Sequence, residues 1–301
     1  MAKKKAASRP NVKEQRQQKG MLCDGLSFAA AEAYKLLRTN LLFSLPEKDC
    51  RIIGVTSSIR GEGKSTTAVN LSYTLAESGK RVLLIDADMR LPSIATKLSI
   101  ASTPGLSNLL AGLREEWECM HVSSYYSNWY ILPAGDIPPN PSELLGSERM
   151  RALLERYAGI FDFIIIDLPP VTVVTDARVI SPWIDGLIMA VRQNYTTRRA
   201  LKDCMYQIEK IGSKFLGFVM TDAAVGASSY KRYGKYGKSY GYGYGYGYDS
   251  AEAKPTGKND KAFISAAMER RKAPERPAEA APAPKQAAAP AVESESAAED
   301  D

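Results

Sequence analysis

The sequence predicts an α/β protein in which a doubly wound, mostly parallel sheet is flanked by helices and accompanied by disordered tails. First, continuous apolar runs, typical of strands buried on both faces, alternate with segments of helical apolar spacing. Second, the net charge of +6 resolves into +6 on residues 1–20, +4 on residues 230–248, −3 on residues 249–301 and −1 on residues 21–229. The predicted folded part is thus close to neutral, which argues against a basic nucleic-acid-binding domain.

The elements follow in order along the chain. The first is a helix over residues 27–43, because apolar residues recur there at helical spacing from Ala30 through Ala33 and Leu37 to Leu41. Each expected strand is a short apolar run bounded by polar or turn residues. The expected strands are Ile52–Thr56, Val82–Ile85, Trp129–Leu132, Phe163–Ile166, Leu187–Val191 and Phe215–Met220. The expected helices between them include 64–78, 142–157 and 195–211.

The composition also predicts how the chain is organised. Residues 1–20 are polar and basic, and residues 249–301 are rich in Ala, Pro and charge, so neither can build a core. Residues 230–248 are a Tyr/Gly-rich segment. We therefore expect a single folded domain over residues 21–229 between segments without a fixed fold.

Three features indicate a cytoplasmic protein. No apolar run approaches the roughly 18–20 residues that span a bilayer. The basic N-terminus has no apolar stretch of the kind that secretory signals carry. The four cysteines are scattered without a CxxC pair, which favours reduced thiols.

A phosphate-binding loop is the most specific motif. Residues 52–65, IIGVTSSIRGEGKS, read as a strand, a glycine-containing loop and the start of a helix. They match the Walker A pattern GxxxxGK[ST] at Gly63, Lys64 and Ser65, while Ser58 stands where the first glycine is expected. The glycines let backbone N–H groups surround phosphates, and the helix N-terminus adds its dipole. This motif predicts a P-loop NTPase fold of the Min/Par-like type. Nucleotide-binding residues are expected to be Arg60, Gly61, Glu62, Gly63, Lys64, Ser65 and Thr66.

Aspartates at two strand ends strengthen this prediction. Asp86 and Asp88 end the apolar run RVLLIDADMR, and residues two apart on a strand face the same side. Asp167 ends FDFIIIDLPP, as a Walker B carboxylate would. A lone aspartate at a strand end is more often a helix cap. Three of them beside a phosphate-binding loop instead predict a nucleotide–Mg²⁺ site at the carboxyl edge of the sheet.

Four motifs carry a family resemblance. The segments GEGKST, LLIDADMRLP and IIIDLPP, the last followed by VTDA, closely resemble the bacterial tyrosine kinases that accompany capsule and exopolysaccharide export. The loop GDIPPNPSELL (Gly135–Leu145) is similar to this family's signature loop, and the resemblance covers residues 24–248. It implies a protein-tyrosine kinase that uses ATP and Mg²⁺. The catalytic HRD loop and the DFG motif of eukaryotic kinases are both missing from the sequence.

The resemblance also implies a role for each site residue. Lys64, Ser65 and Thr66 would bind the phosphates and Mg²⁺, and Asp86 and Asp167 would hold the metal together with Ser65. Lys64, Asp86, Asp88 and Asp167 form the expected catalytic set. Asp88 would orient or deprotonate the tyrosine hydroxyl, whose usual pKa of about 10 makes it a poor nucleophile.

The Tyr/Gly-rich segment would then be the substrate, phosphorylated between subunits. Its Gly spacers expose each phenol, and its four basic residues favour approach to an acidic site. Each phosphate would add about −1.5 to −2 charges, which would turn the segment from +4 to negative. The expected phosphoacceptors are Tyr230, Tyr233, Tyr236, Tyr240, Tyr242, Tyr244, Tyr246 and Tyr248.

Assembly and partners follow from the same resemblance. The family carries Glu-x-x-Arg-x-x-Arg where this chain has Glu32, Lys35 and Arg38, and this pattern implies subunit contacts in a ring, an octamer in the family. Lys35 keeps the charge of the first arginine but lacks its planar fork. The alternative is a charged surface helix with an i,i+3 pair. Implied partners are a membrane polysaccharide co-polymerase that activates the kinase at the inner membrane face and a cognate tyrosine phosphatase.

Departures from the family leave two other functions open. Arg60 sits where relatives often have proline, and the last strand ends in Thr221-Asp222, where related sites offer an Asn to the adenine. One alternative is a Min/Par-type ATPase, although such proteins carry a signature lysine at the position of Ile59. The other is an adaptor in which nucleotide only controls oligomerisation.

Overall fold

The computed structural model describes residues 25–211 and 214–223. Within this part of the chain, every helix is too short or too polar to cross a membrane. The predicted N-terminal segment, the tyrosine cluster at 230–248 and the tail at 249–301 lie outside the described residues.

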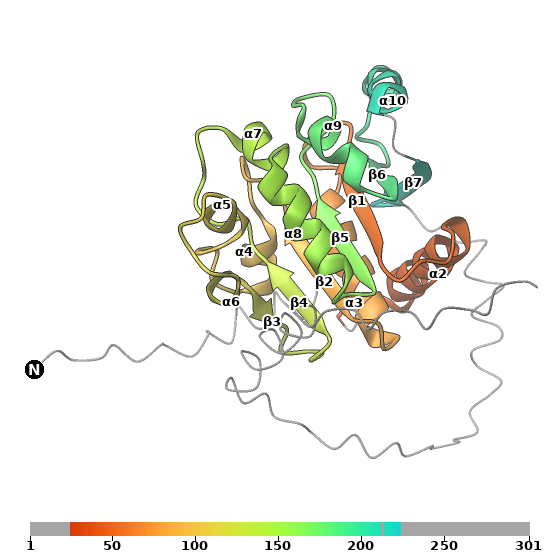
Figure 1. The fold of residues 1–301 in the computed structure, drawn as a ribbon. Helices are drawn as coiled ribbons and strands as arrows, with labels where there is room; N and C mark the ends of the chain where they lie inside the picture. The colour runs from red at the N-terminus through yellow and green to blue at the C-terminus, as the bar shows by residue number, and fades with distance from the viewer. Residues whose placement is uncertain (1–24, 212–213, 224–301) are drawn as a thin grey trace, which may run out of the picture.

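One seven-stranded sheet, in the order β3-β4-β2-β5-β1-β6-β7, forms the centre of the fold. All neighbouring strands run parallel except β3, which pairs antiparallel with β4 at the edge. This arrangement confirms the predicted α/β fold, and all six predicted strands occur (Figure 1). The strands are β1 (Arg51–Ser57), β2 (Val82–Asp86), β3 (His121–Val122), β4 (Trp129–Leu132), β5 (Phe163–Asp167), β6 (Gly186–Arg192) and β7 (Phe215–Thr221).

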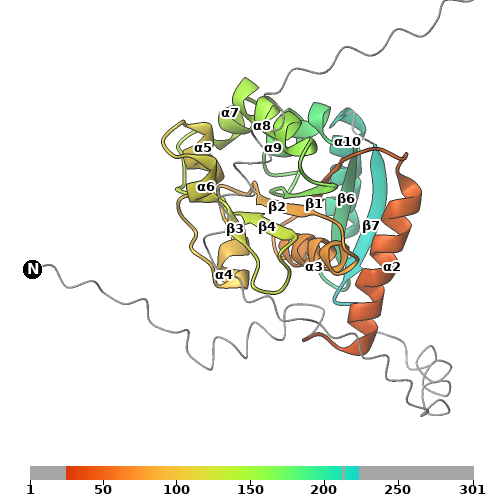
Figure 2. The ribbon, with the colours of Figure 1, turned by 60° about the horizontal axis from the view of Figure 1, so that its bottom comes forward.

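Helices cover both faces of the sheet (Figure 2). Helices α2, α3 and α4 lie on one face, and α7 to α10 lie on the other. Their bounds are α2 (Phe28–Ser44), α3 (Lys64–Glu77), α4 (Ile94–Leu98), α5 (Leu106–Leu110), α6 (Glu116–Cys119), α7 (Pro141–Leu145), α8 (Glu148–Ala158), α9 (Asp176–Ile180), the 3₁₀ helix η1 (Ser181–Trp183) and α10 (Arg198–Ile211).

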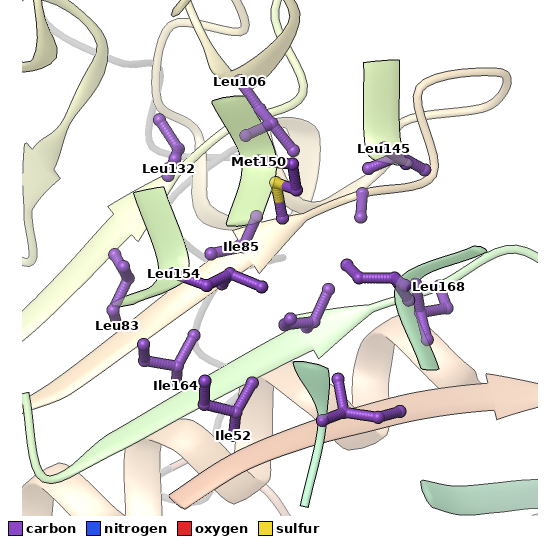
Figure 3. Packing of buried hydrophobic residues seen from close by; sticks show 14 of the residues in the cluster. Ile52, Leu83, Ile85, Leu106, Leu132, Leu145, Met150, Leu154, Ile164 and Leu168 are labelled. Atoms are coloured by element: carbon purple, nitrogen blue, oxygen red, sulfur yellow. The ribbon is translucent and has the colours of Figure 1, made fainter. Parts of the chain in front are cut away.

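Alternation along the central strands builds two separate cores. Ile52, Leu83 and Ile164 point to the face covered by α8, where Met150 and Leu154 pack on the sheet (Figure 3). The residues that follow them in each strand point to the opposite face and pack against α3. Successive side chains of a strand face opposite sides, so strands buried on both faces must be apolar throughout.

The predicted helix over 142–157 is two helices. Helix α7 ends at Leu145, and α8 begins at Glu148 after Ser147, whose hydroxyl accepts a hydrogen bond from the Met150 N–H (3.2 Å). A serine at this position satisfies a backbone donor that a new helix leaves without an intrahelical partner. Helix α7 carries part of the signature loop, and its Ser142 contacts Arg90 in the loop that follows β2.

Candidate active site

The loop between β1 and α3 adopts a conformation that requires its glycines. Gly61 and Gly63 have positive φ angles of 84° and 87°, a region that other residues rarely adopt. A Cβ atom on Gly63 would lie 3.1 Å from the Thr221 side chain, and one on Gly61 would lie 3.2 Å from the Tyr195 hydroxyl. Gly63 is the N-cap of α3 and offers no side-chain cap. The first backbone N–H groups of α3 therefore suit a phosphate ligand.

Lys64 lies between two carboxylates from neighbouring strands. Its Nζ is 2.7 Å from Asp88 Oδ2 and 3.3 Å from Asp167 Oδ1. Asp167 is fully buried and Asp88 is 4% exposed. Burial lowers the pKa of Lys64, but the charges of Asp167 and Asp88 outweigh this and hold that pKa above its usual value. Burial raises the pKa of Asp167, against the opposing effect of Lys64.

Asp86 joins the same cluster from β2. It lies opposite Asp167 in the register of β2 and β5. Its Oδ1 accepts a hydrogen bond from the Asp88 N–H (3.2 Å), and its Oδ2 accepts from the N–H groups of Ser93 and Ile94 (3.0 Å each). Burial, followed by the charge of Asp167, raises the pKa of Asp86 to about 7. Asp86 thus orders the start of α4 while facing the other carboxylates.

Two cavities meet at the phosphate-binding loop. The first has a volume of about 340 Å³ and the second of about 500 Å³, and both are bordered by Gly61, Gly63 and Thr66. Together they provide a charged compartment beside Lys64 and a larger, more apolar one between α2 and the end of β7, which suits a nucleoside triphosphate. The other residues of the first are Arg60, Lys64, Ser65, Asp88, Leu91, Ser93 and Lys97.

The oxygen ligands at this edge fit Mg²⁺. The candidate ligands are the hydroxyl of Ser65 and the carboxylates of Asp86 and Asp167, and the Ser65 side chain is hydrogen-bonded to Asp167. Among the described residues, no group of three or more His, Cys, Asp or Glu side chains could hold a metal alone. Mg²⁺ typically takes only one or two carboxylates and completes its shell with substrate phosphates and water.

The Glu62 side chain is directed into the protein. It is fully buried, and its carboxylate accepts hydrogen bonds from Ser58 Oγ (2.7 Å), the Ile59 N–H (2.8 Å) and the Thr196 hydroxyl. The side chains of Glu62 and Ser58 therefore stabilise the loop from its protein side. Because the Glu62 side chain is turned away from the cavity, only its backbone could make the predicted nucleotide contact.

Arg90, Ser142 and Asp176 form a polar link between segments that the sequence analysis did not place together. The Arg90 guanidinium donates to both oxygens of the buried Asp176 (3.3 Å each) and to Ser142 Oγ (3.0 Å). The loop after β2 is thereby tied to α7 and to the start of α9. Two of the three residues lie in motifs that the sequence analysis had singled out, since Asp176 is the aspartate of VTDA and Ser142 belongs to the signature loop. Nothing in the sequence showed that the two motifs meet.

The larger cavity explains the apolar spacing of α2. Ala30, Ala33 and Leu37 line this cavity, Leu37 also packs against the core on the α3 side of the sheet, and of the four spaced residues only Leu41 is buried. Across the cavity, Asp222 pairs with Arg192 (3.0 Å) at the end of β7. The region where relatives offer an Asn thus carries an ion pair in this chain.

The predicted oligomer residues lie on α2. Lys35 pairs with Glu32 on the surface (3.0 Å). Arg38 instead turns inward, donates to the Thr74 carbonyl (2.6 Å) and lies 3.7 Å from Glu77.

Arg60 is exposed at the rim of the smaller cavity. The structure thus brings together the P-loop residues and three aspartates, whereas the eight predicted phosphoacceptor tyrosines are outside the described residues.

Comparison with known proteins agrees with this geometry. Residues 50–216 match the AAA domain family. The chain is 35% identical over 208 residues to tyrosine-protein kinase CpsD of Streptococcus agalactiae, covering 69% of this chain and 90% of CpsD. It is 34% identical over 207 residues to tyrosine-protein kinase YwqD of Bacillus subtilis, covering 69% of this chain and 86% of YwqD.

A solved structure gives the same result in three dimensions. The kinase domain of the Escherichia coli tyrosine kinase ETK superposes with a TM-score of 0.59 at 31% identity, covering 64% of this chain and 77% of that domain. The residues that match the AAA domain family, 50–216, include the phosphate-binding loop and all three aspartates. The chain therefore belongs to the bacterial tyrosine-protein kinases.

Proposed function

We propose that this kinase transfers the γ-phosphoryl group of Mg-ATP to the tyrosines of residues 230–248 on a neighbouring copy, and so regulates capsular or exopolysaccharide polymerisation and export. The observation that carries the proposal is the cluster of Lys64, Asp88 and Asp167 behind a phosphate-binding loop. In the same chain, a segment with eight tyrosines follows the domain.

Each group in the cluster has a task in the transfer. Backbone N–H groups at the start of α3 bind the phosphates, and Lys64 neutralises charge on the phosphoryl group. Bound at Ser65, Asp86 and Asp167, Mg²⁺ would supply Lewis-acid charge neutralisation. Asp88 orients the tyrosine hydroxyl and accepts its proton, because it is the carboxylate closest to Lys64 (2.7 Å) and lines the cavity.

Arg90 positions the loop that carries Asp88, the residue that would receive the tyrosine proton. Its bonds to Asp176 and Ser142 fix the loop that carries Asp88 against α7 and α9. A phosphoryl acceptor must be aligned within a few tenths of an ångström, so a rigid support for Asp88 favours transfer.

The remaining expectations complete the proposal. The family resemblance supports a ring of copies, an activating membrane co-polymerase, a cognate phosphatase and a position at the inner face of the membrane. The ring would place the tyrosines of one copy beside the site of the next. Phosphorylation would then reverse the charge of residues 230–248 and weaken the assembly.

The test is mass spectrometry for phosphotyrosine on the purified full chain, incubated with Mg-ATP and the activator's cytoplasmic segment. We expect phosphotyrosine within residues 230–248 for the wild type and none for Lys64→Met. Asp88→Asn should abolish transfer while ATP binding is retained, since the amide cannot accept the proton. ATP hydrolysis without phosphotyrosine would instead support a nucleotide-gated adaptor or a Min/Par-type ATPase.

Transfer between copies needs a separate experiment. A chain with Lys64→Met but intact tyrosines is mixed with an active chain whose eight tyrosines are all replaced by Phe. We expect phosphotyrosine on the Lys64→Met chain. An unmodified Lys64→Met chain, beside a wild type that phosphorylates itself, would show that transfer stays within one copy.

A further inference from the structure

A second lysine-bearing element borders the smaller cavity. Helix α4 follows the loop of Asp88, and its residue Lys97 lines this cavity together with Leu91 and Ser93. The phosphate-binding loop with Lys64 borders the same cavity. Both α4 and α3 lie on the same face of the sheet, where Ile94 of α4 packs in the same core as α3 (Figure 2). The position of Lys97 is therefore fixed by a packed helix.

Lys97 is half-buried and forms no ion pair within the part of the chain that the structure describes. Among the described residues its ammonium makes no ion pair or hydrogen bond with another side chain. Burial lowers the pKa of Lys97, the charge of Asp167 raises it, and the charge of Lys64 lowers it again. A partly buried cation without a partner is unfavourable, and an anion in the cavity would stabilise it.

The alternative explanation for Lys97 is local. It lies in the last turn of α4, where a cation interacts favourably with the helix dipole. Helix α4 has only five residues, and a lysine with this task alone would extend into solvent. Lys97 instead borders the compartment that Lys64 and Asp88 share.

We propose that Lys97 is a second phosphate-binding lysine, which contacts the terminal phosphate of the bound nucleotide from α4. This inference rests on the proposed function, because it assumes a nucleoside triphosphate in the cavity. The loop and the start of α3 surround the inner phosphates. Asp88, the proposed proton acceptor, lines the same cavity as Lys97, so the phosphoryl group to be transferred would lie between them. A cation there neutralises charge on the equatorial oxygens.

The assignment predicts that Lys97 distinguishes ATP from ADP. A lysine on the inner phosphates would contribute to both nucleotides, whereas one on the terminal phosphate contributes to ATP alone. Lys97 would thus favour the binding of ATP over that of ADP.

The experiment is a fluorescence titration of the full chain with N-methylanthraniloyl-ATP and N-methylanthraniloyl-ADP in the presence of Mg²⁺. We expect Lys97→Met to weaken ATP binding about ten-fold and ADP binding less than about two-fold, as loss of one charge-assisted hydrogen bond would. Lys97→Arg, which keeps the charge, should restore most of the ATP affinity. Lys80→Met is the matched control, because Lys80 is exposed and distant from the site. Thermal unfolding of each variant reports on folding.

Each outcome decides the inference. A selective loss of ATP affinity in Lys97→Met, with rescue by Lys97→Arg, supports it. Unchanged ATP binding, or an equal loss for ATP and ADP, overturns it while the proposed function stands. If the wild type binds neither nucleotide, the proposed function fails and this assignment fails with it. If Lys97→Met unfolds, Lys97→Arg and Lys97→Gln are compared in its place, and equal ATP-to-ADP ratios in both overturn the inference.

Discussion

The carboxylate of Glu62 shows how a single side chain can shape the phosphate-binding loop from the protein side. It is fully buried and accepts three hydrogen bonds, two from side-chain hydroxyls and one from the Ile59 N–H. Hydroxyl groups can rotate and accept instead of donate, but a backbone N–H can only donate. The bond to Ile59 therefore decides which replacements the loop tolerates.

We expect Glu62→Ala to lower the free energy of unfolding by about 3 kcal/mol, because it leaves buried donors without partners and opens a cavity. Glu62→Gln should cost about 1 kcal/mol or less, since its carbonyl can still accept from Ile59 while its amide donates to the two hydroxyls. Urea unfolding measures both changes. Glu47→Ala, at an exposed glutamate, is the control. Equal stability of Glu62→Ala and the wild type would contradict this role.

At the scale of elements, α2 is attached to the domain by a polar contact as well as by its apolar face. Arg38 donates to the Thr74 carbonyl near the C-terminal end of α3 and lies beside Glu77. The opposite side of α2 leaves Phe28, Leu36 and Phe43 exposed. Helix α2 also forms one wall of the larger cavity, so its attachment controls the shape of that cavity.

We expect Arg38→Ala to lower the free energy of unfolding by about 1–2 kcal/mol, because it removes a charge-assisted hydrogen bond to a backbone carbonyl. Lys35→Ala should change it by less than about 0.5 kcal/mol, because Lys35 forms only an exposed pair with Glu32. Urea unfolding at low protein concentration measures both. An Arg38→Ala variant as stable as Lys35→Ala would show that the contact does not hold α2.

The same contact changes how the proposed ring should be tested. A charge reversal at Arg38 would disturb α2 itself, so a smaller assembly would have two explanations. Glu32→Lys alters an exposed residue whose side chain, among the described residues, pairs with Lys35 alone. We expect light scattering to show a smaller assembly for Glu32→Lys at unchanged thermal stability if the ring uses this face.

At the scale of the whole molecule, the active site costs stability. Three carboxylates converge where the carboxyl ends of β2 and β5 meet, and two of them are fully buried. Burial raises the pKa of both Asp86 and Asp167, so the folded protein holds protons that the unfolded chain releases. The buried carboxyls thus lower the free energy of unfolding, and in return they form a site that can bind a cation.

The unfolding free energy should therefore fall as pH rises from 6 to 8 in the absence of Mg²⁺ and nucleotide. A carboxyl whose pKa is near 7 when folded and about 4 when unfolded contributes its full stability below pH 4 and loses it through pH 7. We expect a loss of about 1–2 kcal/mol for the wild type and a flatter profile for Asp86→Asn. Urea unfolding at several pH values measures both.

Two controls accompany the pH series. Burial lowers the pKa of His121, which raises stability with pH below about 6.5, so the difference between wild type and Asp86→Asn isolates the carboxyl effect. Added Mg²⁺ should stabilise the wild type most at pH 8, where the carboxylates are ionised. Parallel profiles for the two proteins would contradict the role of Asp86.

Most of the fold could be predicted because the central strands are apolar on both faces. Such runs are visible without any knowledge of their neighbours. The two-residue β3 and the four- and five-residue helices α4, α5, α6 and α9 escaped prediction, because each is shorter than two helical turns or one strand of average length. The break after Leu145 was missed because the apolar spacing continues across it.

The sequence by itself determined which segments along the chain are strands and helices, where the phosphate-binding loop lies and which aspartates end two strands. These features depend on local spacing and residue chemistry. Only the tertiary structure decided that Glu62 points inward, that Arg38 holds α3, that Arg90 joins two motifs and that Lys97 borders the phosphate cavity. A polar side chain takes the direction in which burial and a partner are offered, and those partners come from segments distant in the chain. The placement of strands β2 and β5 side by side, with their ends in register, is what brings the aspartates to one lysine.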